Sequence, residues 1–302
     1  MEKGVTIGTF DGVHRGHRLV LDTLKKEASA RGLQPIAMTF DRHPLQLIAP
    51  ERAPGNLMSA ARKAELIKRE GVEPIILPFT EKLRGMSAYQ WLDHIHRVYG
   101  VRLLVVGYDN TFGSDGIHMS LSDYKTMGDA IGIEVALAPE AEGVSSSEVR
   151  KAVKAGDIRR ACALLGHRPE LEGKVTSGFH VGSEIGFPTA NLQTDPAAVH
   201  PATGAYAAHA FINNDTSPIP AMVNIGYRPT FNGTGIESAH MTVEAHLIGI
   251  HDDLYGKNIR LEWIDRLRDE QKFGSVKALT AQLERDRELT LQLSERCESS
   301  YC

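Results

Sequence analysis

The sequence predicts two domains of different fold class, an α/β domain with a parallel sheet followed by an antiparallel β-barrel. Up to about residue 165, apolar strand-like runs alternate with amphipathic helical segments, as in doubly wound sheets. From Leu171 onward, short alternating strands are separated by Gly, Pro and Asn, as in compact barrels. The 302 residues suffice for two domains of ordinary size, which we place at residues 1–168 and 171–302.

In the first domain, the predicted strands are short apolar runs that lead into polar or glycine-containing turns. They begin at Val5 and continue at residues 35–40, 74–78, 102–107 and 133–137. Helices are predicted between them at residues 16–30, 60–70 and 88–99, and another after Ser145. Because helix and strand alternate, we expect the strands to be parallel, with the ligand-binding residues at their carboxyl ends.

In the second domain, the alternating pattern predicts strands at residues 172–177, 205–212, 221–225, 240–250 and 258–263. A terminal helix is predicted from Val276 to about Ser294, because leucines recur there at helical spacing. We expect this helix to cover one side of the barrel.

Composition and charge limit the possible partners and locations. The net charge of −4 provides no general attraction to nucleic acid or to an anionic membrane, so any phosphate site must be local. Cys162, Cys297 and Cys302 are widely spaced, which predicts no disulfide framework and fits a reducing cytoplasm. We find no signal peptide and no apolar run long enough to span a membrane, and therefore expect a soluble cytoplasmic protein.

The segment that joins the first strand to the first helix reads G-T-F-D-G-V-H-R-G-H from Gly8 to His17. A helix N-terminus at the end of a parallel strand favours phosphate. His14 and His17 can face one anionic group there, while Gly16 lets the backbone come close. The alternatives are a capped helix start with two exposed histidines, or half of a metal site.

Further polar residues follow other strands of the first domain. Pro44 stops the second strand and leaves Asp41 and His43 near its carboxyl end. Asp109 and Asn110 follow the fourth strand in the same way.

Three serines begin the helix after the last predicted strand of the first domain. Ser145 and Glu148 match a capping box, but Ser145 to Ser147 with Arg150 also suit a phosphate clamp. A helix-turn-helix over residues 148–165 is a weaker interpretation, since the chain offers only a small basic face there, made of Arg159, Arg160 and Arg168.

In the second domain, glycines from Gly173 to Gly186 precede the string P-T-A-N, although glycine spacing alone can be turn punctuation. The oxygens of Thr189 and Asn191 suit a hydrated Mg²⁺ and its phosphates. On the strand that follows later, Glu244 is expected on the face opposite Val243 and Ala245, where a carboxylate can accept a proton. Its alternative interpretation is an exposed strand glutamate.

These motifs resemble one family over nearly the whole chain. The Gly8–His17 string resembles the nucleotidyltransferase signature, and in particular the flavin adenylyltransferase module of bacterial bifunctional riboflavin kinase/FAD synthetases. S-S-S-x-x-R at residues 145–150 resembles that family's S-S-T-x-x-R, and P-T-A-N resembles its riboflavin kinase signature. Further matches follow in the family's order at residues 201–206, 224–231, 243–247, 254–256 and 268–273.

The resemblance implies a Rossmann-like FMN adenylyltransferase domain and a riboflavin kinase barrel. Such an enzyme phosphorylates riboflavin to FMN with ATP, then adenylylates FMN with a second ATP, giving FAD and pyrophosphate. It implies riboflavin, FMN and ATP as small-molecule partners and Mg²⁺ as cofactor, with no nucleic acid and no membrane.

The resemblance also assigns residues. His14, His17 and Glu244 are the catalytic ones. The residues that it assigns to ATP binding by the adenylyltransferase are Gly8, Thr9, Phe10, Asp11, Gly12, His14, His17, Asp109, Ser145, Ser146, Ser147 and Arg150. ATP binding by the kinase falls to Gly173, Lys174, Gly178, Gly182, Thr189 and Asn191, of which Thr189 and Asn191 also hold Mg²⁺. Flavin binding falls to His43, Asn110, Arg228 and Arg268.

The sequence departs from the family's pattern at three places. Ser147 stands where threonine is usual and keeps the hydroxyl, Ser183 stands where arginine is common, and Met1 lies almost in the first strand. Two alternatives therefore stay open. The first is a nucleotidyltransferase for another acceptor, such as pantetheine phosphate or choline phosphate. The second is a flavin-binding carrier without turnover.

Overall fold

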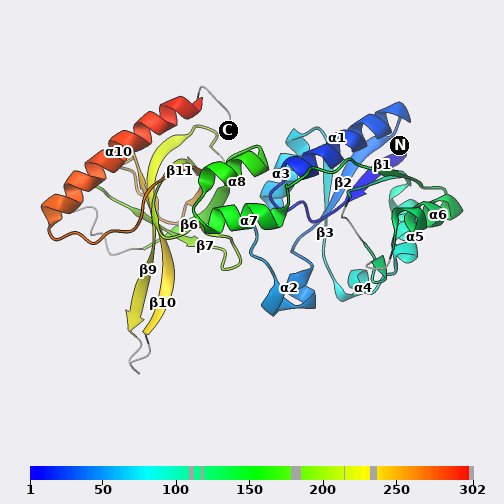
Figure 1. Ribbon diagram of the computed structural model, residues 1–302, viewed down its shortest axis with the longest axis horizontal. Helices are drawn as coiled ribbons and strands as arrows, with labels where there is room; N and C mark the ends of the chain where they lie inside the picture. Colours follow the sequence, from blue (N-terminus) through cyan, green and yellow to red (C-terminus); the bar gives the residue numbers. More distant parts are fainter. Residues whose placement is uncertain (109–111, 117–118, 178–184, 214, 232–236, 299–302) are drawn as a thin grey trace. The chain divides into compact units, whose positions relative to one another are not determined.

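A computed structural model of the protein describes residues 1–108, 112–116, 119–177, 185–213, 215–231 and 237–298 (Figure 1). Within these ranges, the side chains of residues 228–231, 237–240 and 297–298 are not described. The chain divides into two compact units, Met1–Ser145 and Ser146–Cys302.

The first unit is built on a five-stranded parallel sheet with the order β3-β2-β1-β4-β5. The strands are β1 (Lys3–Ile7), β2 (Gln34–Phe40), β3 (Glu73–Leu77), β4 (Val101–Val106) and β5 (Glu134–Leu137). The order reverses at β1, which lies between β2 and β4, so the carboxyl end of β1 is a switch point of the kind that binds ligands. The predicted parallel α/β fold is confirmed.

Helices cover both faces of this sheet. Leu21, Leu24 and Ile67 pack on one face, whereas Trp91 and Tyr124 pack on the other. The helices are α1 (Arg15–Ala30), α2 (Leu45–Ile48), α3 (Ala60–Arg69), α4 (Glu81–Arg84), α5 (Ala88–Tyr99) and α6 (Leu121–Ile131), with a 3₁₀ turn η1 (Pro50–Arg52).

The sequence analysis did not predict α2, α4 or α6. Helix α6 supplies the crossover that two parallel strands such as β4 and β5 require. Its amphipathic pattern is weak, because Tyr124 and Gly128 are its buried residues. Its start nevertheless carries a capping box made by Ser120 and Asp123, which was a usable signal.

The second unit contains a closed antiparallel barrel with the order β10-β7-β6-β11-β8-β9. Its strands are β6 (Glu170–Thr176), β7 (Ala190–Thr194), β8 (Gly204–Ile212), β9 (Ile219–Phe231), β10 (Glu237–Leu247) and β11 (Asn258–Arg268). The terminal helix α10 (Val276–Glu298) contacts β8, β9 and β11, as expected of a cover. The predicted barrel is confirmed. Strand β7 is an addition to the predicted strands, because its five residues offer only Ala190 and Leu192 as inward apolar residues.

The second unit also includes α7 (Ser146–Lys154) and α8 (Ile158–Leu165), which precede the barrel. Helix α8 packs on β11, and Ile158 joins the barrel core. Arg159 pairs with Asp265, and Arg160 pairs with Glu148. A DNA-reading role for these helices is therefore disfavoured, because two of the three arginines that would form its basic face are bound to carboxylates.

Cys162 on α8 is disulfide-bonded, which differs from the expectation based on its wide separation from Cys297 and Cys302.

Within the described part of the chain, no helix is both long enough and apolar enough to cross a membrane.

Candidate active sites

In the first unit, the two histidines lie together where α1 begins. His14 is the N-cap of α1, and its Nδ1 accepts a hydrogen bond of 3.3 Å from the backbone N–H of His17. The two rings are stacked, with centroids 3.6 Å apart and planes at 16°. His14 thus caps the helix, as one alternative expected, but His14 is only 6% exposed and His17 is half-buried, so the two histidines are not exposed.

Gly16 lies against the ring of His14. A Cβ atom at Gly16 would come within 3.2 Å of this ring, which is tighter than ordinary contact. A small residue is therefore required here by the imidazole ring itself, while the predicted approach of this backbone to an anionic group stays a prediction.

The turn before His14 is strained. Phe10 and Val13 have positive φ angles of 46° and 40°, and Gly12 has 87°. Such angles cost non-glycine residues about 1–3 kcal/mol each and persist only when surrounding contacts fix them. The N–H of Val13 donates to the carbonyl of Phe10 at 3.0 Å, and the buried carboxylate of Asp11 accepts the N–H of Leu57 at 3.0 and 3.1 Å.

A buried lysine on α3 also binds this turn by a hydrogen bond. The ammonium of Lys63 on α3 donates to the carbonyl oxygens of Thr9 at 2.8 Å and Phe40 at 3.0 Å. Burial lowers the pKa of Lys63 to about 8, although the charges of Asp11 and Asp41 oppose this shift. A displacement from 10.5 to about 8 corresponds to roughly 3 kcal/mol for keeping the ammonium charged in this place.

The residues after β2 are fixed by hydrogen bonds to neighbouring backbone. Burial raises the pKa of Asp41, but hydrogen bonds from the Phe79 N–H and from Arg42 outweigh it, and the net shift is downward. The Nδ1 atom of His43 accepts the N–H of Leu45 at 3.2 Å, at the start of α2. Asp109 and Asn110, which were expected at the end of β4, lie outside the described residues.

The serine motif begins the second unit. Ser146 and Ser147 form the first turn of α7, directly after Ser145. Arg150 on the same helix is 8% exposed, and Glu148 pairs with Lys151 and Arg160. A hydroxyl pair at a helix N-terminus with a guanidinium one turn later suits an anion.

In the barrel, the register brings two of the candidate kinase residues, Asn191 and Glu244, into one row with other polar residues. Glu244 on β10 lies directly opposite Asn191 on β7 and opposite Asn224 on β9. Thr176 on β6 in turn lies opposite Asn191. Directly opposed residues of antiparallel strands share a face, so Asn224, Glu244, Asn191 and Thr176 follow one another on one polar surface.

The predicted face of β10 is confirmed. Val243, Ala245 and Leu247 are buried in the barrel core, whereas Glu244 and His246 are half-buried on the opposite face. The carboxylate thus stands on the outer wall of the barrel among amide oxygens and nitrogens.

The segment before β7 is tied to β10 by His246. Its Nδ1 lies 2.7 Å from the carbonyl oxygen of Pro188, so that nitrogen carries the proton and donates it. The ring also makes an edge contact with buried Phe187, with a centroid distance of 5.3 Å. Burial lowers the pKa of His246, although the bond to Pro188 opposes the shift. This anchor fixes the backbone immediately before Thr189, whose side chain is exposed.

The remaining kinase candidates are placed as follows. Gly173 lies within β6, where a Cβ would come within 3.0 Å of Leu192, and Lys174 is exposed on the same strand. Arg268 pairs with Asp286 of α10 at 2.9 Å, and Gln282 donates to the other oxygen of that carboxylate. Gly178, Gly182 and Ser183 lie outside the described residues, as does the side chain of Arg228.

The oxygen-rich row fits Mg²⁺ better than it fits a transition metal. Among the described residues, no group of three or more His, Cys, Asp or Glu side chains is placed to hold a metal ion. Mg²⁺, however, keeps several waters and uses one or two protein oxygens together with substrate phosphates. Asn191 in this row and the exposed Thr189 just before β7 offer oxygens of that kind.

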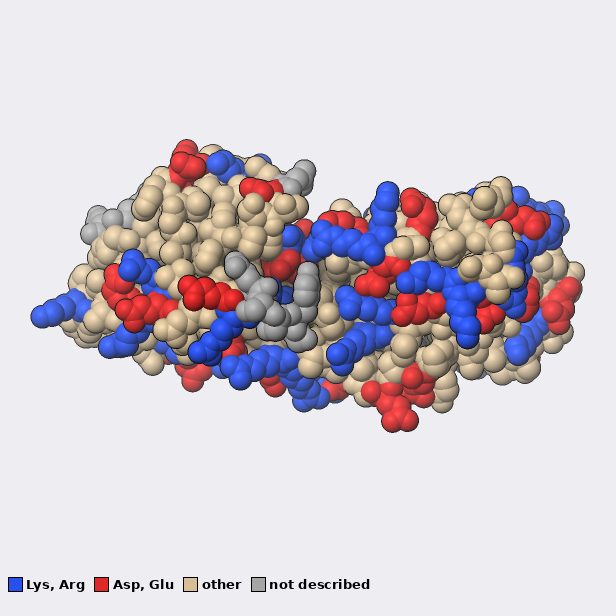
Figure 2. Space-filling model, turned by 90° about the horizontal axis from the view of Figure 1, so that it is seen from above, with Lys and Arg blue, Asp and Glu red and all other residues tan. Residues whose placement is uncertain are grey.

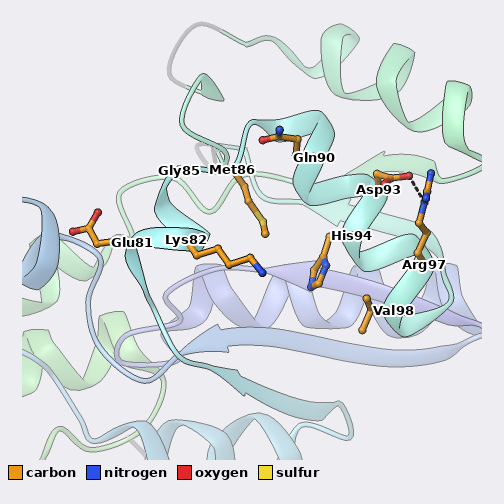
Figure 3. Close-up of a pocket in the computed structure, with 9 residues that line it drawn as sticks. All are labelled: Glu81, Lys82, Gly85, Met86, Gln90, Asp93, His94, Arg97 and Val98. Atoms are coloured by element: carbon orange, nitrogen blue, oxygen red, sulfur yellow. Dashed lines mark hydrogen bonds and ion pairs between the residues drawn. The ribbon is translucent and has the colours of Figure 1, made fainter.

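An open pocket of about 550 Å³ lies apart from these residues in the first unit, along α4 and the outer side of α5 (Figure 3). Its lining includes Lys82, Met86 and His94, as well as Asp93 and Arg97, which form an ion pair of 2.7 Å. None of the predicted site residues lines it.

In the view of Figure 2, basic and acidic side chains are interspersed over the surface.

The sequence analysis missed three residues that shape these sites, namely Lys63, Asn224 and His246. For Lys63 there was a signal, because it stands on the stripe of α3 that also carries Leu66 and Ile67, where an apolar residue is expected. Asn224 and His246 were quoted within motifs, but their roles depend on strand register, which the sequence does not reveal.

Comparison with known proteins assigns both halves. Residues 1–150 match the family model of FAD synthetase, and residues 165–294 match that of riboflavin kinase. The nucleotidyltransferase and kinase motifs thus fall within separate, correctly ordered family regions.

Relatives match over the whole chain. Bifunctional riboflavin kinase/FMN adenylyltransferases of Bacillus subtilis (strain 168) and Pseudomonas fluorescens are 33% and 36% identical, covering 94% and 93% of this chain and 90% and 89% of their own. That of Escherichia coli (strain K12) is 34% identical and covers 95% of this chain and 90% of its own. The chain therefore belongs to the bifunctional riboflavin kinase/FMN adenylyltransferase family.

A solved structure shares the complete fold. It is described as a macrolide-efflux protein from Streptococcus pneumoniae, is 31% identical and has a TM-score of 0.82 over 96% of this chain and 94% of its own. Its name suggests a different function, whereas both family models and the curated relatives agree with one another.

Proposed function

We propose that the protein makes FAD from riboflavin in two ATP-dependent steps, with one active site in each half. The observation that carries this proposal is the presence of two separate polar sites on one chain, the stacked histidines at α1 and the Glu244 row on the barrel. We assign FMN adenylylation to residues 1–168 and riboflavin phosphorylation to residues 171–302.

In the kinase half, Glu244 accepts the proton of the ribityl 5′-hydroxyl of riboflavin. The hydroxyl oxygen then forms a bond to the γ-phosphorus of ATP, the bond from this phosphorus to the bridging oxygen breaks, and ADP leaves. Thr189 and Asn191 would hold Mg²⁺, which neutralises charge on the ATP phosphates when bound. Gly173, Lys174, Gly178 and Gly182 are assigned to ATP, and Arg228 and Arg268 to the flavin.

In the adenylyltransferase half, the FMN phosphate is already an anion and needs no base. One of its oxygens attacks the α-phosphorus of ATP in line, and pyrophosphate leaves. His14, His17 and Arg150 stabilise the developing charge, and the hydroxyls of Ser145, Ser146 and Ser147 bind the phosphate tail. The turn from Gly8 to Gly12 and Asp109 complete the ATP site, while His43 and Asn110 contact the flavin. The substrates are those of cofactor synthesis, and we place the protein in the cytoplasm.

Reciprocal variants test the assignment of one site to each half. His17→Ala is expected to abolish FAD formation and leave FMN formation intact, because the charge-stabilising imidazole is lost only at α1. Glu244→Ala is expected to block riboflavin phosphorylation and leave adenylylation of supplied FMN unchanged. Products are separated by chromatography after incubation with riboflavin or FMN, ATP and Mg²⁺.

Each variant also carries its own control for folding, because the reaction that it is expected to retain can be measured in the same protein. The assignment is wrong if either single change abolishes both activities in a folded protein.

A further inference from the structure

Lys63 occupies an unusual place for a charged side chain. It is 7% exposed and faces the sheet from α3, beside Leu66 and Ile67. An ammonium in such a position is disfavoured unless it is paired and hydrogen-bonded, and a well-packed apolar residue is often at least as stable there. The lysine therefore contributes something other than packing.

The ammonium joins the ends of two neighbouring strands. The carbonyl of Thr9 belongs to the turn after β1, and the carbonyl of Phe40 is the last of β2. Strands β1 and β2 are adjacent and parallel, so both carbonyls lie at the same edge of the sheet. The first turn leads to the histidines at α1, and the second leads to Asp41 and His43.

The turn that Lys63 holds requires external support. Phe10 and Val13 keep left-handed backbone angles, which relax unless neighbouring groups fix the chain. The carbonyl of Thr9, directly before Phe10, accepts from Lys63 and also from the hydroxyl of Thr39 at 3.0 Å. Thr39 lies in β2 and ties the turn to that strand by one bond, whereas Lys63 adds a second tie from α3 by binding both the Thr9 and the Phe40 carbonyls.

We propose that Lys63 is a positioning residue of FMN adenylylation, which holds the nucleotide-binding turn in register with the flavin-binding end of β2. The inference rests on the roles proposed above for His14, His17 and His43. Lys63 itself contacts backbone oxygens and needs no contact with the reacting atoms.

Steady-state kinetics of variants of the full chain distinguish the contribution of Lys63 from those of its neighbours. Lys63→Met is expected to lower kcat/KM for FAD formation at least tenfold, with higher KM values for both ATP and FMN. Thr39→Val removes one donor to the Thr9 carbonyl but leaves both hydrogen bonds from Lys63 in place, so it is expected to lower kcat/KM by a clearly smaller factor than Lys63→Met. Lys68→Met, an exposed lysine on the same helix, is the charge-matched control and leaves both values unchanged.

Two further readouts exclude a merely structural role. The melting temperature of Lys63→Met is expected to equal or exceed that of the wild type, because the variant no longer buries a charge. Lys63→Arg keeps the charge and two donors, and is expected to recover part of the lost activity. Lys63→Gln, which keeps an amide donor but is too short to reach both carbonyls, replaces Lys63→Met in the comparison if the latter does not fold.

The inference is overturned if FAD formation by Lys63→Met stays within twofold of the wild type, if only one KM changes, or if activity falls in step with a lowered melting temperature. His17→Ala is assayed alongside. Retained FAD formation in that variant contradicts the proposed site at α1, whereas its loss together with an active Lys63→Met contradicts only the role of Lys63.

Discussion

The two halves of the protein hold their sites by different means. In the first unit, the histidines follow a strained turn that is fixed by groups from distant segments, including Lys63, Leu57 and Thr39. In the barrel, the row around Glu244 results directly from strand register, with each residue opposite the next. The first site depends on tertiary contacts, and the second depends on the alternation of a sheet.

Because of this difference, residues remote from the reacting atoms should matter more in the first unit than in the barrel. A substitution that disturbs a tertiary support should affect the first site from a distance. In the barrel, the backbone ladder itself supports the row, so distant side chains should matter less. Three further measurements test whether the two sites differ in this way.

The largest effect is expected on stability at alkaline pH. The pKa of Lys63 is lowered to about 8 in the folded protein, so between about pH 8 and 10.5 the unfolded chain binds more protons at this residue. The free energy of unfolding of the wild type should therefore rise relative to Lys63→Met across this range, by up to about 3 kcal/mol.

Urea unfolding of both proteins at pH 7 and at several higher values measures this difference. Asp11 and Asp41, the charged groups that act on Lys63, are the same in both proteins. A difference that does not change with pH would contradict a buried ammonium with a lowered pKa.

A smaller effect is expected from Gly16→Ala. The added methyl group would press on the ring of His14 at 3.2 Å and displace the stacked histidines. We expect FAD formation from FMN to fall roughly tenfold, equivalent to about 1.4 kcal/mol, while riboflavin phosphorylation is unchanged. Gly32→Ala has open space for the methyl group but a positive φ angle, and so serves as the control for a general glycine effect. Equal losses in the two variants would argue against a specific role for the histidine pair.

The smallest effect is expected from His246→Phe in the barrel. The variant keeps an aromatic ring against Phe187 but loses the hydrogen bond to Pro188, a contact of about 1 kcal/mol. The KM of the kinase for ATP should rise about fivefold with little change in kcat, because Thr189 is held less firmly while Glu244 stays in its register. A fall in kcat of a hundredfold would show that the barrel site also depends on distant support.

The sequence predicted the alternation of β10 and the strand-to-helix junction at α1, because both are local patterns of a few residues. It did not predict β7, which is short, or the positive φ angles of Phe10 and Val13, which are not readable from residue type. Lys63 could have been noticed as a charge on an apolar stripe, but its two carbonyl partners lie far away in the chain. Contacts between distant segments are what sequence patterns do not contain.

We expect the two sites to work independently and in succession on one chain. Mixing His17→Ala protein with Glu244→Ala protein, in the presence of riboflavin, ATP and Mg²⁺, tests it most directly by chromatography of the products. Each variant alone should fail to convert riboflavin to FAD, whereas the mixture should first accumulate FMN and then form FAD. Accumulation of FMN without FAD in the mixture, or no product at all, would contradict the account.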